Sequence, residues 1–192
     1  MFGFIALFRG SRTELQAGRK SNEKALAAAV FALQHVGTVD ATAAGNDGMR
    51  RDWPLLHKIF SVSCSTGFYN SPRKTAVRTA GAKLDSWCGI FTNYACLSVG
   101  ATTGKWPAPG FVKWTSHNFK QVNIPDPKPG DVINAPQNKN NHFALCLEYD
   151  PSSRQITTID GNSAPGGYAS GGKIVVQKRH RSWWRGFWRA PV

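Results

Sequence analysis

Acidic residues are scarce in this chain. Asp and Glu number 11 against 24 Lys and Arg, so the formal net charge is +13. That excess predicts attraction to a polyanion such as nucleic acid, an anionic membrane surface or a bacterial wall rich in carboxylates and phosphates. Because 41% of the 192 residues are hydrophobic and 18% charged, we expect a globular fold with a real core rather than disorder.

Cysteine is also rare, and the four present are Cys64, Cys88, Cys96 and Cys146. They form no CxxC pair and are too widely spread to be the disulfide framework of a small secreted domain. If Cys88 is a reactive thiol, at most one structural bridge fits. The chain also lacks an HExxH motif and a GxxxxGK[ST] loop, so we expect no metal and no cofactor.

Long apolar runs are missing as well. The N-terminus begins MFGFIALF and then reaches Arg9, Arg12 and Lys20. A secretory signal has its basic residues first, so this order predicts no signal peptide. No stretch approaches the length of a membrane-spanning helix, and we expect no insertion into a membrane.

Helical patterns come first along the chain. Helices are predicted at 22–36, capped by Ser21 or Asn22, at about 53–62, and at 84–99. The first is expected to dock on the main body through one apolar face. The segment 38–51 is interpreted as a linker or loop, and 63–82 is a polar stretch that contains glycine. The apolar positions of that first helix are Leu26, Val30 and Leu33.

Strand patterns follow the helices, which predicts the α+β class rather than alternating βαβ units. The strands are expected at 131–135, 142–149, 155–160, 173–178 and 183–190. We divide the chain into an N-terminal helical extension, residues 1–45, and a main domain, residues 46–192.

Cys88 is the first candidate for chemistry. If Asp85 or Ser86 caps the helix that Gly100 ends, Cys88 lies in the first turn, where unpaired N–H groups and the helix dipole favour a thiolate. The alternative is a small buried hydrophobic residue, the commoner fate of a cysteine. Position alone does not decide between the two.

His142 is the second candidate. Strand alternation puts it on one face with Ala144, Cys146 and Glu148, while Phe143, Leu145, Leu147 and Tyr149 form the opposite, apolar face. A histidine base needs a third group to hold its tautomer, and Asp160 and Asn162 at the end of the next strand can accept a proton from its ring. Without these partners a structural histidine is the commoner outcome. Cys146 is interpreted as a core residue rather than a metal ligand.

The C-terminal aromatic residues Trp183, Trp184 and Trp188 stand among arginines. Such a mixture could stack nucleic-acid bases, line a sugar-peptide groove, or pack beneath arginine stems. Packing is the commonest outcome for a terminal strand, and we favour it.

Five segments together resemble CHAP-type (NlpC/P60-like) cysteine amidases, in order, from about residue 80 to the C-terminus. DSWCGIFTNYA at 85–95 resembles that family's WCAAFVNW-like cysteine helix, and PKPGDVI at 127–133 resembles its PxPGDIV strand. Asn141 and His142 stand where the family usually has Gly-His. IDGN at 159–162 resembles its EGN or GGN element, and WRGFWRAP at 184–191 its terminal GyR-P strand.

This resemblance implies a papain-like fold in which a cysteine-bearing helix packs on an antiparallel sheet. It makes Cys88 the nucleophile and His142 the general base and acid, with Asp160 and Asn162 orienting or assisting the histidine. Which of these two orients the ring stays open. The chain departs from the family in having Asn141 in place of glycine, and no upstream side chain matches the family's oxyanion donor.

The function implied is a peptidoglycan hydrolase that cuts an amide of the wall peptide through a thioester, as an N-acetylmuramoyl-L-alanine amidase or an endopeptidase. It would act in the periplasm or cell wall as a monomer, delivered by a secretion system or released by phage lysis. A delivered effector implies an immunity protein as partner, and nucleic acid is not expected. The alternatives are a basic nucleic-acid-binding module with structural Cys88 and His142, or a papain-like hydrolase of protein amides.

Overall fold

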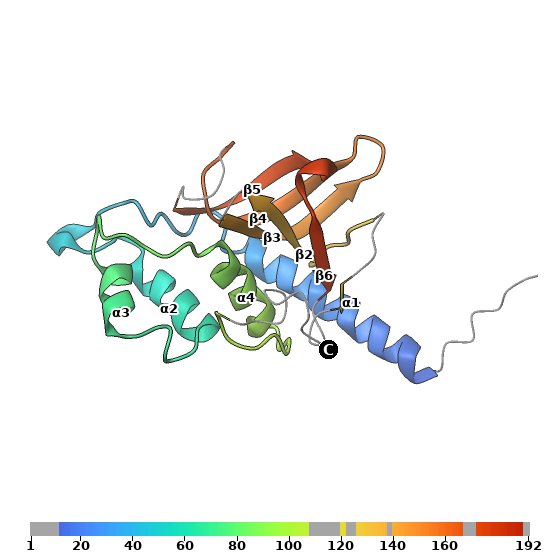
Figure 1. Ribbon diagram of the computed structural model, residues 1–192, viewed down its shortest axis with the longest axis horizontal. Helices are drawn as coiled ribbons and strands as arrows, with labels where there is room; N and C mark the ends of the chain where they lie inside the picture. The colour runs from blue at the N-terminus through green and yellow to red at the C-terminus, as the bar shows by residue number, and fades with distance from the viewer. Residues whose placement is uncertain (1–11, 108–119, 122–125, 138–139, 167–171, 190–192) are drawn as a thin grey trace, which may run out of the picture.

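The computed structural model describes residues 12–107, 120–121, 126–137, 140–166 and 172–189, and within them helices precede strands (Figure 1). The prediction of an α+β class is confirmed. The α-helices in these ranges are α1 (Arg12–Leu33), α2 (Trp53–Ser63), α3 (Ser71–Arg78) and α4 (Cys88–Ser98).

One antiparallel sheet contains every strand of the described ranges, in the order β1-β6-β2-β3-β4-β5. The second to fifth strands along the chain match the predicted segments to within a few residues. The strands are β1 (Lys120–Gln121), β2 (Val132–Gln137), β3 (Asn140–Asp150), β4 (Gln155–Ser163), β5 (Lys173–His180) and β6 (Gly186–Arg189). The last begins later than predicted, because residues Arg181–Trp183 form a 3-10 turn, and the expected end at Ala190 lies outside the described residues.

Helix α4 lies at the centre of the molecule, packed against α1 and α2 as well as β3 and β4 (Figure 1). Its buried Asn93 donates one hydrogen bond to the Ser63 carbonyl at the end of α2 (3.2 Å) and another to the Gly104 carbonyl (3.1 Å). A buried polar group fully used in this way fixes the position of a helix as well as its packing. Asn93 therefore fixes the middle of α4 relative to the end of α2.

The sheet has two apolar faces. The face toward α4 carries Phe143, Leu145 and Ile159 into the main core. The opposite face carries a smaller cluster, which consists of Ile133, Ala135, Ala144, Cys146, Ile156, Trp184 and Phe187. The alternation predicted for the His142 strand is confirmed as far as Leu147.

The alternation of β3 then changes phase, and the prediction for Tyr149 is wrong. Pairing with β4 shifts register between Cys146 and Glu148, which is a β-bulge. An extra residue in one strand turns the following side chains to the other face. Tyr149 consequently packs with the smaller cluster rather than with Leu145.

Two predictions for the first helix are wrong. Helix α1 begins at Arg12, ten residues before the expected cap, and Leu26 and Val30 are about half exposed, at 51% and 50%. The buried face consists of alanines, among them Ala25 and Ala28. A Cβ built on Gly130, which has φ +83°, would lie 1.7 Å from the Ala25 carbonyl oxygen, so backbone meets backbone here and only small side chains fit.

The polar segment 63–82, for which no helix was predicted, contains α3. The sequence carried a sign of it, because Asn70 accepts a hydrogen bond from the Arg73 N–H as an N-cap and Pro72 lies in the first turn. No helix of the described ranges is long and apolar enough to cross a membrane.

The motif around Asp131 meets the C-terminal strand. The buried Asp131 carboxylate accepts two hydrogen bonds from Arg189, at 2.8 and 2.9 Å, and one from the Lys128 N–H. A bidentate arginine–carboxylate pair of this kind is directional as well as strong. The pair joins the segment 127–133 to the C-terminal segment 184–191, which is far from it in the sequence.

Candidate active site

Cys88, His142 and Asp160 come from three elements that pack on one another, namely α4, β3 and β4. Asp160 pairs with Ala144 across the two strands, and His142 lies two residues from Ala144 on the same face of β3. All three side chains are buried, and Cys88 is 2% exposed. The candidates named from the sequence therefore come together in space.

The start of α4 differs from the prediction. Cys88 is the first helical residue and Trp87 the N-cap, with no side-chain cap. Neither expected cap is available: Asp85 accepts a 2.6 Å hydrogen bond from Arg73, and the Ser86 hydroxyl lies 3.6 Å from the Cys88 sulfur. The first-turn position of Cys88 is nevertheless confirmed, at the positive end of the helix dipole.

Asp160 is the residue that holds the histidine ring. Its Oδ2 lies 2.7 Å from His142 Nε2, and the same oxygen accepts a 2.7 Å hydrogen bond from Arg179 Nη1. Oδ1 accepts a 2.5 Å hydrogen bond from the Thr158 hydroxyl. A carboxylate with both oxygens engaged keeps one orientation, so the ring it holds does too.

Asn162 lies elsewhere. Its backbone adopts φ +54°, which turns the chain after Gly161, and its side-chain amide donates a 3.5 Å hydrogen bond to the Ser86 hydroxyl. Asn162 thus contacts the residue beside the thiol rather than the imidazole. Of the two candidates for orienting His142, the structure brings only Asp160 to the ring.

The thiol and the imidazole form a polarised pair. Burial raises the pKa of Cys88, but the hydrogen bond and charge of His142, the Phe143 backbone and the Ser86 hydroxyl outweigh it, so the pKa lies below its ordinary value. Burial lowers the pKa of His142, and hydrogen bonds with Asp160 and Cys88 raise it to about 9. Both shifts favour the ion pair of thiolate and imidazolium over the neutral thiol and imidazole.

The ring nitrogens have separate partners. Nε2 is occupied by Asp160, which leaves Nδ1 for the interaction with the thiol. Nδ1 is buried and forms no direct hydrogen bond of good geometry with a nitrogen or oxygen of the described residues. With Asp160 accepting from Nε2–H, Nδ1 is the nitrogen that takes the thiol proton.

Arg179 is a residue of this site that the sequence analysis did not name, because it stands among several other basic residues near the C-terminal tryptophans. Its guanidinium lies over the rings of Trp183 and Trp184, 4.6 and 5.6 Å from their centroids, while it binds Asp160. Strand alternation could have indicated it. Asp160 pairs with Val175 on β5, and Arg179, four residues later, returns to that face.

The tryptophans confirm the packing interpretation for this segment. Trp184 is buried, and the ring centroids of Trp183 and Trp184 lie 5.9 and 6.3 Å from that of His142. The imidazole is thus enclosed on one side by aromatic rings. Excluding water strengthens its interactions with Asp160 and Cys88.

Two glycines let the elements of the site approach closely. A Cβ on Gly161 would lie 2.6 Å from the Phe91 Cβ of α4, and one on Gly89 would lie 2.5 Å from the Trp106 ring. Real Cβ contacts are essentially never so short. Glycine at these positions lets the β4 end and Trp106 contact the first turns of α4.

The remaining cysteines have no role in this arrangement. All four cysteines lie in the described ranges and none forms a disulfide. Cys146 is a buried core residue, as predicted, and burial raises its pKa to about 12. No cluster of three metal-ligating side chains occurs among the residues that the structure describes.

The site thus has a thiol of lowered pKa, a histidine held by a carboxylate, and helix N–H groups beside the sulfur, which are the groups that acyl transfer needs. Comparison of the chain with protein-family models, with curated proteins and with solved structures found no match.

Proposed function

We propose that this protein is a papain-like cysteine hydrolase of the CHAP (NlpC/P60) type that cleaves an amide bond in the peptide of peptidoglycan. One observation carries the proposal: the buried Cys88–His142 pair, polarised toward thiolate and imidazolium and held by Asp160. A structural cysteine and histidine need no such polarisation. The activated nucleophile beside an oriented base is the arrangement of covalent catalysis.

In the proposed mechanism the Cys88 thiolate attacks the carbonyl carbon of the scissile amide. The oxyanion that forms is stabilised by N–H groups at the start of α4, which have no partner within the helix. His142 gives its proton to the leaving nitrogen as the C–N bond breaks, which leaves a thioester on Cys88. His142 then takes a proton from water, which attacks the thioester and releases the acid and the thiolate.

Peptidoglycan is proposed as substrate on two grounds. The ordered segments from 85–95 to 184–191 resemble the wall amidases, and the Asp131–Arg189 pair joins two of them. The net charge of +13 also favours an anionic wall over a neutral substrate. The bond cut is either the muramoyl–alanine amide or a peptide bond of the stem.

The proposed place of action is the periplasm or cell wall, reached by a secretion machine or by phage lysis. For a delivered antibacterial enzyme we propose an immunity protein as partner. The enzyme would work as a monomer, since all three groups of the site come from one chain.

The experiment is digestion of isolated sacculi by the wild type beside Cys88→Ser, with the released fragments identified by mass. Lactyl-muramic ends with intact peptides identify an amidase, and shortened peptides on the sugar identify an endopeptidase. We expect release to fall by about 1,000-fold or more in Cys88→Ser, because the nucleophile is lost. Equal release by both proteins contradicts the proposal. If neither protein releases fragments from several kinds of cell wall, a protein amide becomes the preferred substrate.

A further inference from the structure

Residues 83–86 lead directly into the nucleophile with their backbone unpaired. No N–H or C=O group of these four residues makes a hydrogen bond with another of the described residues, and the four belong to no helix or strand. Lys83, Asp85 and Ser86 are exposed and Leu84 is half-buried. We call residues 83–86 the approach segment.

Unpaired backbone of this kind resembles the edge of a sheet, a template for pairing with another extended chain. Exposed backbone groups without a protein partner are solvated, and a bound peptide can take the place of that water. The approach segment ends two residues before the Cys88 thiolate. A chain paired with it would therefore be guided to the reacting sulfur.

Both ends of the approach segment are fixed. On one side, the buried Arg50 guanidinium donates hydrogen bonds to the carbonyls of Ala41, Ala76 and Ala82. On the other side, Trp87 is fully buried. A segment anchored at its ends loses less entropy when a ligand pairs with it.

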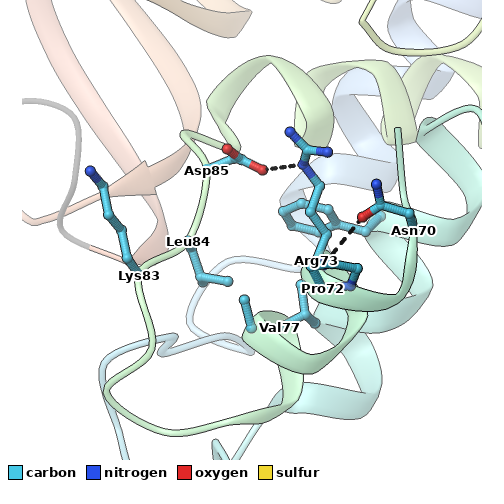
Figure 2. A pocket seen from close by; sticks show the side chains of 9 residues that line it. Asn70, Pro72, Arg73, Val77, Lys83, Leu84 and Asp85 are labelled. Atoms are coloured by element: carbon cyan, nitrogen blue, oxygen red, sulfur yellow. Dashed lines mark hydrogen bonds and ion pairs between the residues drawn. The ribbon is translucent and has the colours of Figure 1, made fainter. Parts of the chain in front are cut away.

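Two cavities share the approach segment as a common wall. One, of about 330 Å³, has an apolar floor that includes Val77 and Leu84 and a rim with Asn70 and Lys83 (Figure 2). The other, of about 770 Å³, continues past Ser86 and Trp87 to Asn162. The larger cavity thus runs from the approach segment, whose Ser86 hydroxyl lies 3.6 Å from the Cys88 sulfur, to Asn162.

The two charged residues of the approach segment differ in whether they are already paired. Asp85 is paired with Arg73, as Figure 2 shows, at 2.6 Å. Lys83 lines both cavities, and its ammonium group makes no ion pair or hydrogen bond with any residue that the structure describes. A ligand carboxylate near Lys83 would meet an uncompensated positive charge.

We propose that the substrate binds as an extended peptide paired through its main chain with residues 83–86, with a carboxylate beside Lys83. This rests on the proposed function and names the form in which its substrate is recognised. Main-chain pairing accepts any extended peptide, while the two cavities select its side groups. At about 3.3 Å per residue, a paired stretch of two or three residues reaches the thiolate.

The test is amide hydrogen exchange, measured by NMR on the full chain with Cys88→Ala, so that the probe is not turned over. The probe is the muramyl pentapeptide. Without it, the amides of residues 83–86 are expected to exchange freely. With it, at least two of them are expected to slow by about tenfold or more, as paired amides do.

The carboxylate contact is tested by Lys83→Gln in the same background, beside Lys58→Gln on the exposed face of α2 as a matched control. We expect Lys83→Gln to lower the affinity for the probe about fivefold and Lys58→Gln to leave it unchanged. Of these two lysines, only Lys83 lines the cavities. Protection confined to other amides, equal effects of the two variants, or no binding of the probe overturns the inference. Sacculus cleavage by the wild type is scored separately, so either idea can fail alone.

Discussion

At the residue scale, Cys88 differs from the other cysteines by its neighbour rather than by its burial. Burial raises the pKa of Cys64, Cys96 and Cys146 to about 12. Cys88 is as well buried, yet its pKa is lowered, because His142 supplies a hydrogen bond and a positive charge. Of these four buried thiols, that of Cys88 alone has its pKa lowered rather than raised.

This difference predicts a single thiolate. Near neutral pH the wild type should show the ultraviolet absorbance of one thiolate, which Cys88→Ser and His142→Ala should both lack. The other three thiols stay protonated under these conditions, because their pKa values are about 12. The same absorbance in Cys88→Ser would assign the thiolate to another cysteine.

The pH dependence of kcat/KM follows from the same pair. His142 is protonated below its pKa of about 9 and loses its proton as the pH rises through that value, so the rate should fall on the alkaline side there. On the acid side the rate should fall where the thiolate of Cys88 takes up a proton. Because the two groups interact, the acid and alkaline pKa values of this rate profile describe the Cys88–His142 pair rather than either residue alone.

Arg179 is expected to be a positioning residue. In Arg179→Met the buried Asp160 loses its 2.7 Å charged hydrogen bond, and the histidine ring loses part of its constraint. We expect kcat to fall about tenfold or more with little change in KM, and Arg179→Lys to restore part of it by keeping the charge. Both variants are assayed by steady-state kinetics over the pH range.

Thermal unfolding distinguishes this role from a structural one. Loss of one partner of a buried ion pair lowers stability, so Arg179→Met should also melt at a lower temperature. A variant that melts lower but keeps the wild-type kcat and pH profile would make Arg179 purely structural.

At the element scale, α1 shows how backbone contact reverses a pattern. Its large apolar residues point to solvent and its alanines into the core, because Gly130 brings the turn before β2 onto the backbone at Ala25. Periodicity identified a helix over most of this range. Periodicity predicted the wrong face of the helix as the buried one. Where two backbones approach closely, the smallest side chains are favoured over the most hydrophobic ones.

Two substitutions in α1 test this. Val30→Gln is expected to change the free energy of unfolding by less than about 0.5 kcal/mol, since the residue is 50% exposed. Ala28→Leu, at a fully buried position, should destabilise by about 1–3 kcal/mol through overpacking. Urea unfolding measures both, and a larger loss from Val30→Gln would mean that the helix docks through its other face.

At the scale of the whole molecule, the site exists only because α4 packs across β3 and β4. Cys88 and His142 meet through this packing, and Asp160 reaches the ring through the register of two strands. Arg179 is added by a third strand. The net positive charge, in contrast, is not confined to the site. It is spread over the chain and does not indicate which bond is cut.

The sequence by itself predicted most of the central elements and named Cys88, His142 and Asp160. It could do so because hydrophobic periodicity and local capping depend on neighbours a few residues away. It missed α3, whose composition is polar, and the phase change at Cys146, because a bulge depends on the partner strand.

Only the tertiary structure decided which candidates touch. It brought Asp160 rather than Asn162 to the imidazole, placed Arg179 behind the carboxylate, and left the backbone of residues 83–86 unpaired beside the nucleophile. The physical reason is common to all three. Distances between residues remote in sequence are set by strand register and helix packing, and local patterns carry no information about these distances.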